Sequence, residues 1–313
     1  MSGAVKTGDP LERRVHLCTT PSPVSSLEAL RPGLWLKDDG GLSPLYGGNK
    51  VRKLEFLLHE APPELTTIGA SGSNHVLATV LHAQAMGHKV HALAVPRIWA
   101  PLPATSLRVT LKNAASLRLM AGLPEAKAAL MAAPKGSVIP AGGSSRFGSL
   151  GFVRAGLELA EQVREGLLPE PKRIAIALGT GGSALGLALG CRMGGLSTQV
   201  HGVRVVPESW LSLRRLKRLA KEISELVGEE PASIQVVDTR LGPDYGWPGP
   251  GTLETLARAR GHVKVEGTYT AKTLAEALDW RDGPDLYWST LNARPLLGLL
   301  AGAPQVERSP WFT

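Results

Sequence analysis

The sequence predicts an α/β protein built of two doubly wound domains with mainly parallel sheets. The chain has 313 residues, enough for two layered domains, and apolar residues at 43% can fill their cores. Short apolar strand patterns alternate with helical patterns along most of the chain. Glycine-rich loops join several of these strands to the helices that follow them. This order is typical of parallel sheets with helices on both faces.

The individual elements follow from local patterns. The apolar segment LTTIGA, from Leu65 to Ala70, predicts a strand, and Asn74–Met86 after it predicts a helix. RIAIAL, from Arg173 to Leu178, predicts a buried strand, and the helix that follows it is expected to extend through Met193. Further strands are expected at Lys89–Val95, Ser116–Met120, Ser137–Pro140, Gln199–Val206, Ile234–Val237 and Asp285–Ser289.

The net charge of +8, from 35 Lys and Arg against 27 Asp and Glu, could suit nucleic acid, a membrane surface or an anionic small molecule. The densest basic stretch is Ser212–Lys221. We interpret it as a surface helix, because one apolar stripe recurs at helical spacing: Trp210, Leu213, Leu216, Leu219 and Ile223. The sequence has no zinc-finger spacing, aromatic RNA-binding signature or heptad zipper, so we expect no nucleic-acid partner.

Cysteine usage and the N-terminal segment bear on the compartment. Cys18 and Cys191 are the only cysteines, too few for a disulfide framework, which fits a reducing environment. The N-terminal segment lacks the apolar core of a signal peptide, and glycines interrupt the apolar stretch Ala175–Leu189. We therefore expect a soluble cytoplasmic protein that does not engage a membrane.

Ligands of parallel α/β sheets bind outside the carboxyl ends of the strands. Three loops rich in Gly and Ser directly follow predicted strands: Ser71–His75, Gly142–Ser145 and Gly179–Ser183. The last of these opens a helix, so its backbone N–H groups can point at an anion that the glycines allow to approach. We interpret it as a phosphate cradle, with an ordinary tight turn as the alternative.

A dinucleotide site fits this loop less well. The loop matches a loose Gly-x-Gly-x-x-Ala pattern, which requires an acidic residue about 20 positions later to bind a ribose hydroxyl. The next strand contains Arg204 and no acid, and the loop has no lysine for a Walker A site. A cofactor with a single phosphate fits better.

Lys50 lies where the turn Gly47–Gly48 meets an amphipathic helix. A lysine forms imines readily when partial desolvation lowers the pKa of its ammonium group. These residues alone do not distinguish Lys50 from Lys53, or either one from a solvated lysine. In the loop Ser71–His75, N–H groups and hydroxyls could bind a carboxylate or a phenolate oxygen, or Ser73 could simply cap the helix.

Several stretches together resemble the 1-aminocyclopropane-1-carboxylate deaminase and D-cysteine desulfhydrase family of pyridoxal-phosphate enzymes, within the tryptophan-synthase-β-like enzymes of fold type II. The matching stretches run from about Leu34 to Lys272: GGNKVRKLEFLL, SNHV, IPAGGSS with GSLGFV, ALGTGGSALGLALG, DYGWP and GTYTAK. The resemblance implies a large cofactor-binding domain of residues 1–52 and 153–313 and a small domain of residues 53–152. It also implies pyridoxal 5′-phosphate in the cleft between the domains, no metal, and a homodimer.

The resemblance also assigns roles to residues. Lys50 matches the lysine that forms the Schiff base with the cofactor. Ser73, Asn74 and His75 match the loop that receives the substrate carboxylate, with Asn74 also near the cofactor's 3′ oxygen and Ser73 as a candidate catalytic hydroxyl. The remaining matches are the phosphate cup (Gly179, Thr180, Gly181, Gly182 and Ser183), two active-site tyrosines (Tyr245 and the catalytic candidate Tyr269) and a hydroxyl facing the pyridine nitrogen (Thr290).

Two positions indicate the substrate. Tyr269-Thr270-Ala271-Lys272 resembles the Tyr-Thr-Gly-Lys of desulfhydrases more than the Tyr-Glu-Gly-Lys of deaminases, and His75 stands where deaminases tend to carry Gln. The resemblance therefore implies α,β-elimination from a β-substituted amino acid, foremost D-cysteine, to pyruvate, hydrogen sulfide and ammonia. Deamination of 1-aminocyclopropane-1-carboxylate remains an alternative.

The chain also departs from the family pattern. Leu77 stands where the family usually has an Arg, the usual Thr-Gly-Gly near the C-terminus is Thr290-Leu291-Asn292, and the spacing between Tyr245 and Tyr269 is slightly short. We expect these differences to change the shape of the entrance to the site. They keep open an alternative of another class, a non-catalytic relative that binds an amino acid or the cofactor.

Overall fold

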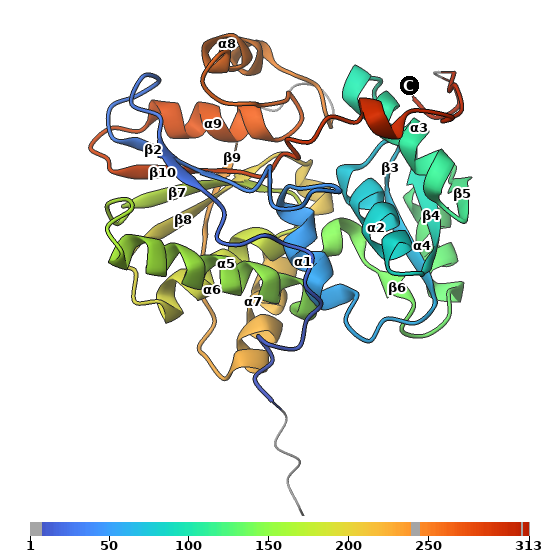
Figure 1. Cartoon of the computed structure of the whole chain (residues 1–313), viewed down its shortest axis with the longest axis horizontal. Helices are drawn as coiled ribbons and strands as arrows, with labels where there is room; N and C mark the ends of the chain where they lie inside the picture. Colours follow the sequence, from blue (N-terminus) through green and yellow to red (C-terminus); the bar gives the residue numbers. More distant parts are fainter. Residues whose placement is uncertain (1–7, 239–244, 308, 313) are drawn as a thin grey trace, which may run out of the picture.

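The computed structural model describes residues 8–238, 245–307 and 309–312. Two mainly parallel sheets, one of six strands and one of four, lie side by side and are covered by helices (Figure 1). This arrangement confirms the predicted α/β class. Asp244 of the DYGWP stretch and residues 1–7 of the N-terminal segment lie outside the described residues.

The six-stranded sheet has the strand order β1-β2-β10-β7-β8-β9. Only β1 runs antiparallel to its neighbour, and the other pairs are parallel. Strand β10 therefore brings the C-terminal part of the chain between β2 and β7. The strands are β1 (Val24–Ser26), β2 (Leu34–Asp38), β7 (Arg173–Leu178), β8 (Gln199–Arg204), β9 (Gln235–Asp238) and β10 (Asp285–Ser289).

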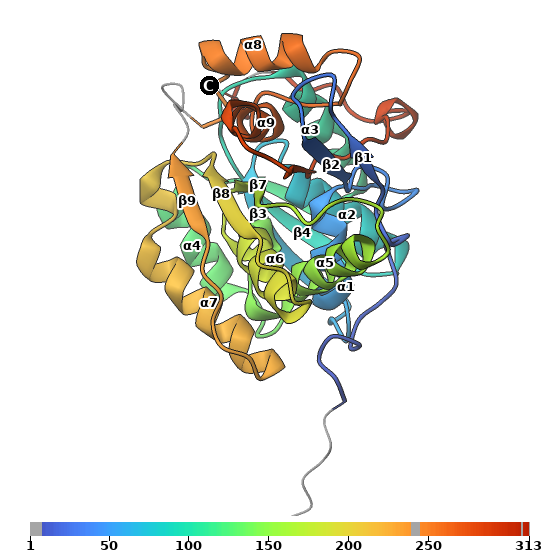
Figure 2. The same ribbon diagram turned by 90° about the vertical axis from the view of Figure 1, so that its left-hand side faces the viewer.

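Successive residues of a strand point to opposite faces of the sheet, and helices cover both faces, so the sheet contributes to two cores. Ile174 and Ile176 of β7 pack in one core with α5, α6 and α7, whereas Ala175 packs in a second core with α8 and α9. Figure 2 shows the two groups of helices on either side of the strands. The helices are α5 (Arg146–Arg164), α6 (Gly182–Met193), α7 (Leu213–Val227), α8 (Pro250–Ala259) and α9 (Thr270–Asp279).

The four-stranded sheet has the order β5-β4-β3-β6, and all its pairs are parallel. Leu65 on one face packs with α2, and Ile68 on the other packs with Ala126 of α4. Helix α1 contacts both α2 and α5, so it joins the two halves of the molecule. The elements are α1 (Asn49–Leu57), β3 (Glu64–Ala70), α2 (Asn74–Ala85), β4 (Lys89–Val95), α3 (Pro101–Asn113), β5 (Ser116–Leu119), α4 (Leu123–Ala132) and β6 (Val138–Ile139).

The predicted strands are present with small shifts at their ends, and so are the predicted helices after Leu65–Ala70, after Arg173–Leu178 and at Lys50. The predicted apolar stripe of the basic helix is partly wrong. Leu216, Leu219 and Ile223 are buried, but Leu213 is 65% exposed, and Trp210 lies before α7 in a short 3-10 turn, Glu208–Trp210. Helical spacing alone does not reveal where a helix begins, so it assigned these two residues to the buried face.

The predicted domain limits at residues 52–53 and 152–153 fall inside α1 and α5 and stay a prediction. Two short turns complete the described fold, Ala141–Gly143 and Leu297–Leu299. Within residues 8–238, 245–307 and 309–312, no helix is long and apolar enough to cross a membrane.

Candidate active site

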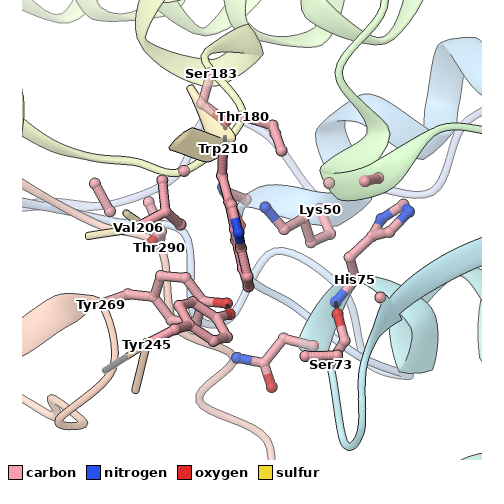
Figure 3. A pocket seen from close by; sticks show the side chains of 18 of the residues that line it. Lys50, Ser73, His75, Thr180, Ser183, Val206, Trp210, Tyr245, Tyr269 and Thr290 are labelled. Atoms are coloured by element: carbon pink, nitrogen blue, oxygen red, sulfur yellow. Dashed lines mark hydrogen bonds between the residues drawn. The ribbon is translucent and has the colours of Figure 1, made fainter. Parts of the chain in front are cut away.

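A cavity of about 210 Å³ lies at the carboxyl ends of strands from both sheets. The three loops singled out in the sequence meet here, since Ser73, Gly142 and Thr180 all line it (Figure 3). It is also lined by most of the other residues that the sequence predicts for a site: Lys50, Asn74, His75, Gly179, Gly181, Ser183, Tyr245, Tyr269 and Thr290. Gly182 is the exception among them, because its N–H donates to Ser144 Oγ behind the cavity surface.

A close contact of backbones positions Lys50 at the start of α1. Gly48, with a φ of 83°, precedes the helix, and a Cβ on Gly47 would lie 2.1 Å from the carbonyl oxygen of Gly40. The Asn49 N–H donates to the Thr290 carbonyl (3.2 Å), which ties the helix start to the end of β10. Only glycine allows this approach. The GGNK turn therefore sets the direction in which the Lys50 side chain leaves the helix.

The ammonium of Lys50 is held in a desolvated place. Burial lowers the pKa of Lys50 from 10.5 to about 8, since a charged amine loses its hydration there. Its Nζ makes no hydrogen bond to another described residue. A neutral amine that is free to react is therefore accessible near neutral pH.

Ion pairs behind α1 hold the helix in place. Arg52 is 2% exposed, and its guanidinium donates to Asp39 (2.9 Å) and to Glu158 (3.0 Å). Trp288 Nε1 donates to the same Asp39 at 2.9 Å. Desolvation raises the pKa of Glu158, but Arg52 and Lys37 outweigh it and lower this pKa to about 2. A carboxylate paired in this way stays charged over the ordinary pH range.

The N-terminus of α6 forms an anion site. Gly181 precedes the helix with a φ of 93° and offers no side-chain cap, so the first N–H groups of the helix point toward the cavity end of β7. The Thr180 and Ser144 hydroxyls lie 2.6 Å apart beside it. A Cβ on Gly182 would lie 2.7 Å from Ser144 Oγ and from Ser149 Oγ. Helix N–H groups and hydroxyls thus converge where a side chain would not fit.

Lys53 completes this cup, and the sequence did not single it out. Its Nζ donates to the Gly142 carbonyl (3.0 Å) and to Ser144 Oγ (2.9 Å). Burial, followed by the nearby charge of Lys50, lowers the pKa of Lys53 well below its usual value. The structure thereby separates the two lysines, since Lys53 is engaged by the cup whereas Lys50 is not. Sequence reasoning gave no role to Asn49, whose Nδ2 donates to Ser183 Oγ (3.2 Å), and it singled out the loop of Ser144 without assigning that residue a role.

These residues fit pyridoxal phosphate. A phosphate suits the uncapped α6 N-terminus with its hydroxyls and Lys53, because backbone N–H groups, hydroxyls and a lysine amine can all donate hydrogen bonds to an anion. An aldehyde suits the desolvated amine of Lys50. Thr290 lies at the end of β10, where it offers a neutral hydroxyl to a ring nitrogen. No cluster of three or more His, Cys, Asp or Glu side chains in the described parts of the chain could hold a metal.

The loop after β3 presents its groups from the other sheet. Ser73 caps α2 by accepting the His75 N–H (3.2 Å), and Asn74 Oδ1 accepts from the Tyr46 hydroxyl (3.2 Å). Thr67 Oγ1 donates to the Ile139 carbonyl and so accepts from His75 Nε2 (3.1 Å). Burial, then Lys50 and Lys53, lower the pKa of His75 well below its usual value, so the ring is neutral. Ser73 retains its hydroxyl hydrogen for a ligand.

Two tyrosines face this loop across the cavity, with their hydroxyl groups hydrogen-bonded to each other (Figure 3). Burial raises the pKa of Tyr269, so its hydroxyl stays protonated. Trp210 packs on Tyr245 with ring centroids 5.2 Å apart and lines the cavity, a role that its predicted place in a helix stripe did not suggest. Glu266 also lines the cavity, but its carboxylate accepts the N–H groups of Thr268, Tyr269 and Thr270.

Comparison with known proteins gives consistent relatives. The nocardicin C-9′ epimerase of Nocardia uniformis subsp. tsuyamanensis is 34% identical over 90% of this chain and 93% of its own. The D-cysteine desulfhydrase of Yersinia enterocolitica is 31% identical over 94% of this chain and 97% of its own. A solved structure described as an ACC deaminase homologue is 25% identical, with a TM-score of 0.77 over 92% of this chain and 96% of that one. Maize serine racemase, at 18% identity and a TM-score of 0.63, shares the fold.

The family described as "Pyridoxal-phosphate dependent enzyme" matches residues 15–286. This match spans the four-stranded sheet, the six-stranded sheet as far as the second residue of β10, and the elements from α1 to α9 that line the cavity. Together with the desulfhydrase relatives it confirms the resemblance seen in the sequence. The chain belongs to the pyridoxal-phosphate-dependent enzymes, in the family of 1-aminocyclopropane-1-carboxylate deaminase and D-cysteine desulfhydrase.

Proposed function

We propose that this protein catalyses α,β-elimination from a β-substituted amino acid, with D-cysteine as the foremost substrate. The products are pyruvate, hydrogen sulfide and ammonia. The observation that carries this proposal is the absence of a free carboxylate among the described residues that line the cavity. Glu266 is the one acid there, and its oxygens are occupied by the N-terminus of α9.

This observation bears on the choice between elimination and ring opening. Bound pyridoxal phosphate supplies an aldehyde for Lys50 and a ring that accepts electrons from Cα. Thr290 offers that ring nitrogen a neutral hydroxyl, which does not stabilise a proton there as a carboxylate would. Thr270 stands at the position where the deaminase pattern has a glutamate. Its hydroxyl accepts the Glu266 N–H at 2.7 Å and so belongs to the cap of α9. A weaker electron acceptor suits departure of a thiolate better than rupture of a carbon–carbon bond.

The residues around the substrate have separate roles in this proposal. The α-carboxylate binds at the N-terminus of α2, where Asn74 and His75 begin the helix and Ser73 caps it. Lys50, as a neutral amine, removes the proton from Cα. Tyr269 stays protonated because burial raises its pKa, and its hydroxyl is aligned by Tyr245. It donates a proton to the departing sulfur. The engaged Lys53 holds the phosphate.

A second candidate, inversion at Cα, is supported by the epimerase relative at 34% identity. Inversion requires a proton donor on the face of Cα opposite Lys50, and Ser73 and Tyr269 are the hydroxyls available from the facing elements. Both reactions begin with loss of the same proton. The β-substituent decides between them, because a substrate without a leaving group cannot eliminate.

The test measures sulfide and pyruvate released from D-cysteine by the holoenzyme. We expect kcat/KM for D-cysteine to exceed that for 1-aminocyclopropane-1-carboxylate, since this ratio reports differential transition-state binding. A higher value for the cyclopropane substrate would show that Thr270 and His75 are misinterpreted. Solvent deuterium at Cα of D-alanine, with formation of L-alanine and no pyruvate, would favour inversion.

A further inference from the structure

A second cavity, of about 310 Å³, lies directly beside the candidate active site. Asn74, Glu266 and Leu291 line both cavities, and we refer to these three residues as the shared wall. We call this second cavity the outer chamber. Beyond the shared wall, it is lined by three leucines and two cations, among other residues: Leu102, Leu296, Leu300, Lys264 and Arg294.

The shared wall consists of one apolar residue, one acid and one amide. Leu291 is its apolar member and is 6% exposed, and it occupies a position where the family usually has glycine. The carboxylate oxygens of Glu266 accept three N–H groups at the start of α9, which partly offset its charge. Asn74 is held by Tyr46. Leu291 is therefore the apolar residue of the wall between the two cavities.

The far side of the outer chamber carries two cations. Arg294 donates from Nε to the Ser43 carbonyl (3.3 Å), which leaves its two terminal amino groups for a ligand. Lys264 donates to the Ala293 carbonyl (3.1 Å). Neither forms an ion pair with an acid in residues 8–238, 245–307 or 309–312. Both residues are exposed.

Asn292 fixes the segment that presents Arg294. Its Oδ1 accepts the N–H groups of Gly47 (2.9 Å) and Arg294 (3.1 Å), and its Nδ2 donates to the Arg294 carbonyl (2.8 Å). The turn that holds Lys50 and the segment that holds the outer cation are thus joined through one amide side chain. The distance between the reacting amine and the cations is set by this link.

We propose that the outer chamber binds the far end of the substrate's side chain, and that this end is an anionic group such as a carboxylate. Leu102, Leu296 and Leu300 pack against the methylene groups of the stem, while Arg294 and Lys264 bind the terminal anion. This inference rests on the proposed amino-acid chemistry at Lys50 and deepens it. Among amino acids with side chains longer than that of D-cysteine, the protein then prefers those whose side chain ends in a carboxylate.

The test is binding to the holoenzyme by titration calorimetry, with D-amino acids that have no β-leaving group. The probes are D-2-aminoadipate, D-2-aminopimelate and D-2-aminosuberate, each compared with its ω-amide. Once the probe's side chain is long enough to pass Leu291, we expect the acid to bind about fivefold more tightly than the amide. A ratio of this size is what an exposed ion pair provides. The double variant Arg294→Ala, Lys264→Ala should reduce this ratio to about one.

The control is Arg281→Ala, which removes an exposed cation beside the opposite ends of β7 and β10 and should leave the acid-to-amide ratio unchanged. Equal binding of acid and amide at every length, no binding of any probe, or a ratio that survives the double variant would overturn the proposal. Sulfide release from D-cysteine on the same preparation judges the proposed elimination separately. Sulfide without an acid preference rejects the chamber alone, and an acid preference without sulfide rejects the elimination alone.

Discussion

The two sides of the cavity are built from different parts of the chain. On the phosphate side, the N-terminus of α6 supplies backbone N–H groups, and Ser144 and Lys53 fill the space around them. On the facing side, the tyrosine pair and Leu291 contribute side chains. Side chains can be exchanged without moving the backbone, whereas the phosphate side leaves no room for a Cβ at Gly182. The comparison indicates that mutations of the first side affect cofactor retention and mutations of the second affect the choice of substrate.

Gly182→Val should produce the largest effect. The added carbons would enter the space held by Ser144 and Ser149, and about two charge-assisted hydrogen bonds to a phosphate would be lost. We expect cofactor affinity to fall about a thousandfold in equilibrium dialysis. Gly251→Val is the matched control, since Gly251 also lies in the first turn of a helix and its Cβ would meet nothing within 4 Å. Equal cofactor affinity in the two variants would contradict the assignment.

Gly181→Val would act by another route. The φ of Gly181 is 93°, and a Cβ there would meet Leu216 Cδ2 of α7 at 2.5 Å, away from the cup. The sequence predicts this glycine to be required for close approach of the phosphate. The structure indicates that its backbone conformation and its contact with α7 also require glycine.

Glu158→Gln tests the support behind the phosphate side. The change leaves Arg52 and Lys37 without part of their counter-charge, so the free energy of unfolding should fall by about 3 kcal/mol in urea titration. Because the pKa of Glu158 is lowered to about 2 from 4.5, its contribution is complete above pH 4.5 and is lost as pH falls toward 2. The acid loss of stability should therefore be shallower in the variant. Exposed Glu161→Gln should change stability by less than about 0.5 kcal/mol.

Tyr269→Phe tests the facing side. Loss of a positioned proton donor should lower kcat for D-cysteine about a hundredfold. Cofactor affinity should stay within about twofold, because the hydroxyl bonds to Tyr245 and not to the cup. If the variant loses cofactor and keeps its kcat when saturated, the division between the two sides is wrong. Tyr46→Phe removes another buried hydroxyl near Asn74 and serves as a comparison.

The reactivity of Lys50 should depend on pH in a defined direction. With a pKa of about 8, the fraction of neutral amine rises about tenfold between pH 7 and pH 9. The rate at which the apoprotein takes up pyridoxal phosphate should rise with it in stopped-flow absorbance. The apoprotein should also gain stability from pH 8 to 10.5, because the buried charge is lost earlier in the folded state than in the unfolded one. A rate midpoint near 10.5 would mean a solvated amine.

The sequence predicts the strands and the three ligand loops because each depends on local composition. RIAIAL is apolar from its second residue to the end of β7, and the glycines of Gly179–Ser183 reveal the turn that follows it. The residues that complete the cup escape such patterns. Lys53 and Gly142 are 89 positions apart in the chain, and nothing near Lys53 in the sequence indicates that its amine donates to the Gly142 carbonyl.

The same limit explains the two corrections. Trp210 and Leu213 fit a helical stripe on spacing, but the start of α7 at Leu213 leaves one in a separate turn beside the cavity and the other at an exposed helix end. The sequence alone also does not separate Lys50 from Lys53. Their difference arises from tertiary contacts, since one amine is engaged by Gly142 and Ser144 while the other is desolvated beside the cavity.

The central claim is that the cofactor is bound covalently to Lys50. Borohydride reduction of the holoenzyme, followed by proteolysis and mass spectrometry, locates the attachment directly. We predict the reduced pyridoxyl group on Lys50 alone, absence of the label in Lys50→Ala, and the label still on Lys50 in Lys53→Ala after reconstitution at high cofactor concentration. A label on Lys53 or Lys272, or no label on a yellow holoenzyme, would contradict the account.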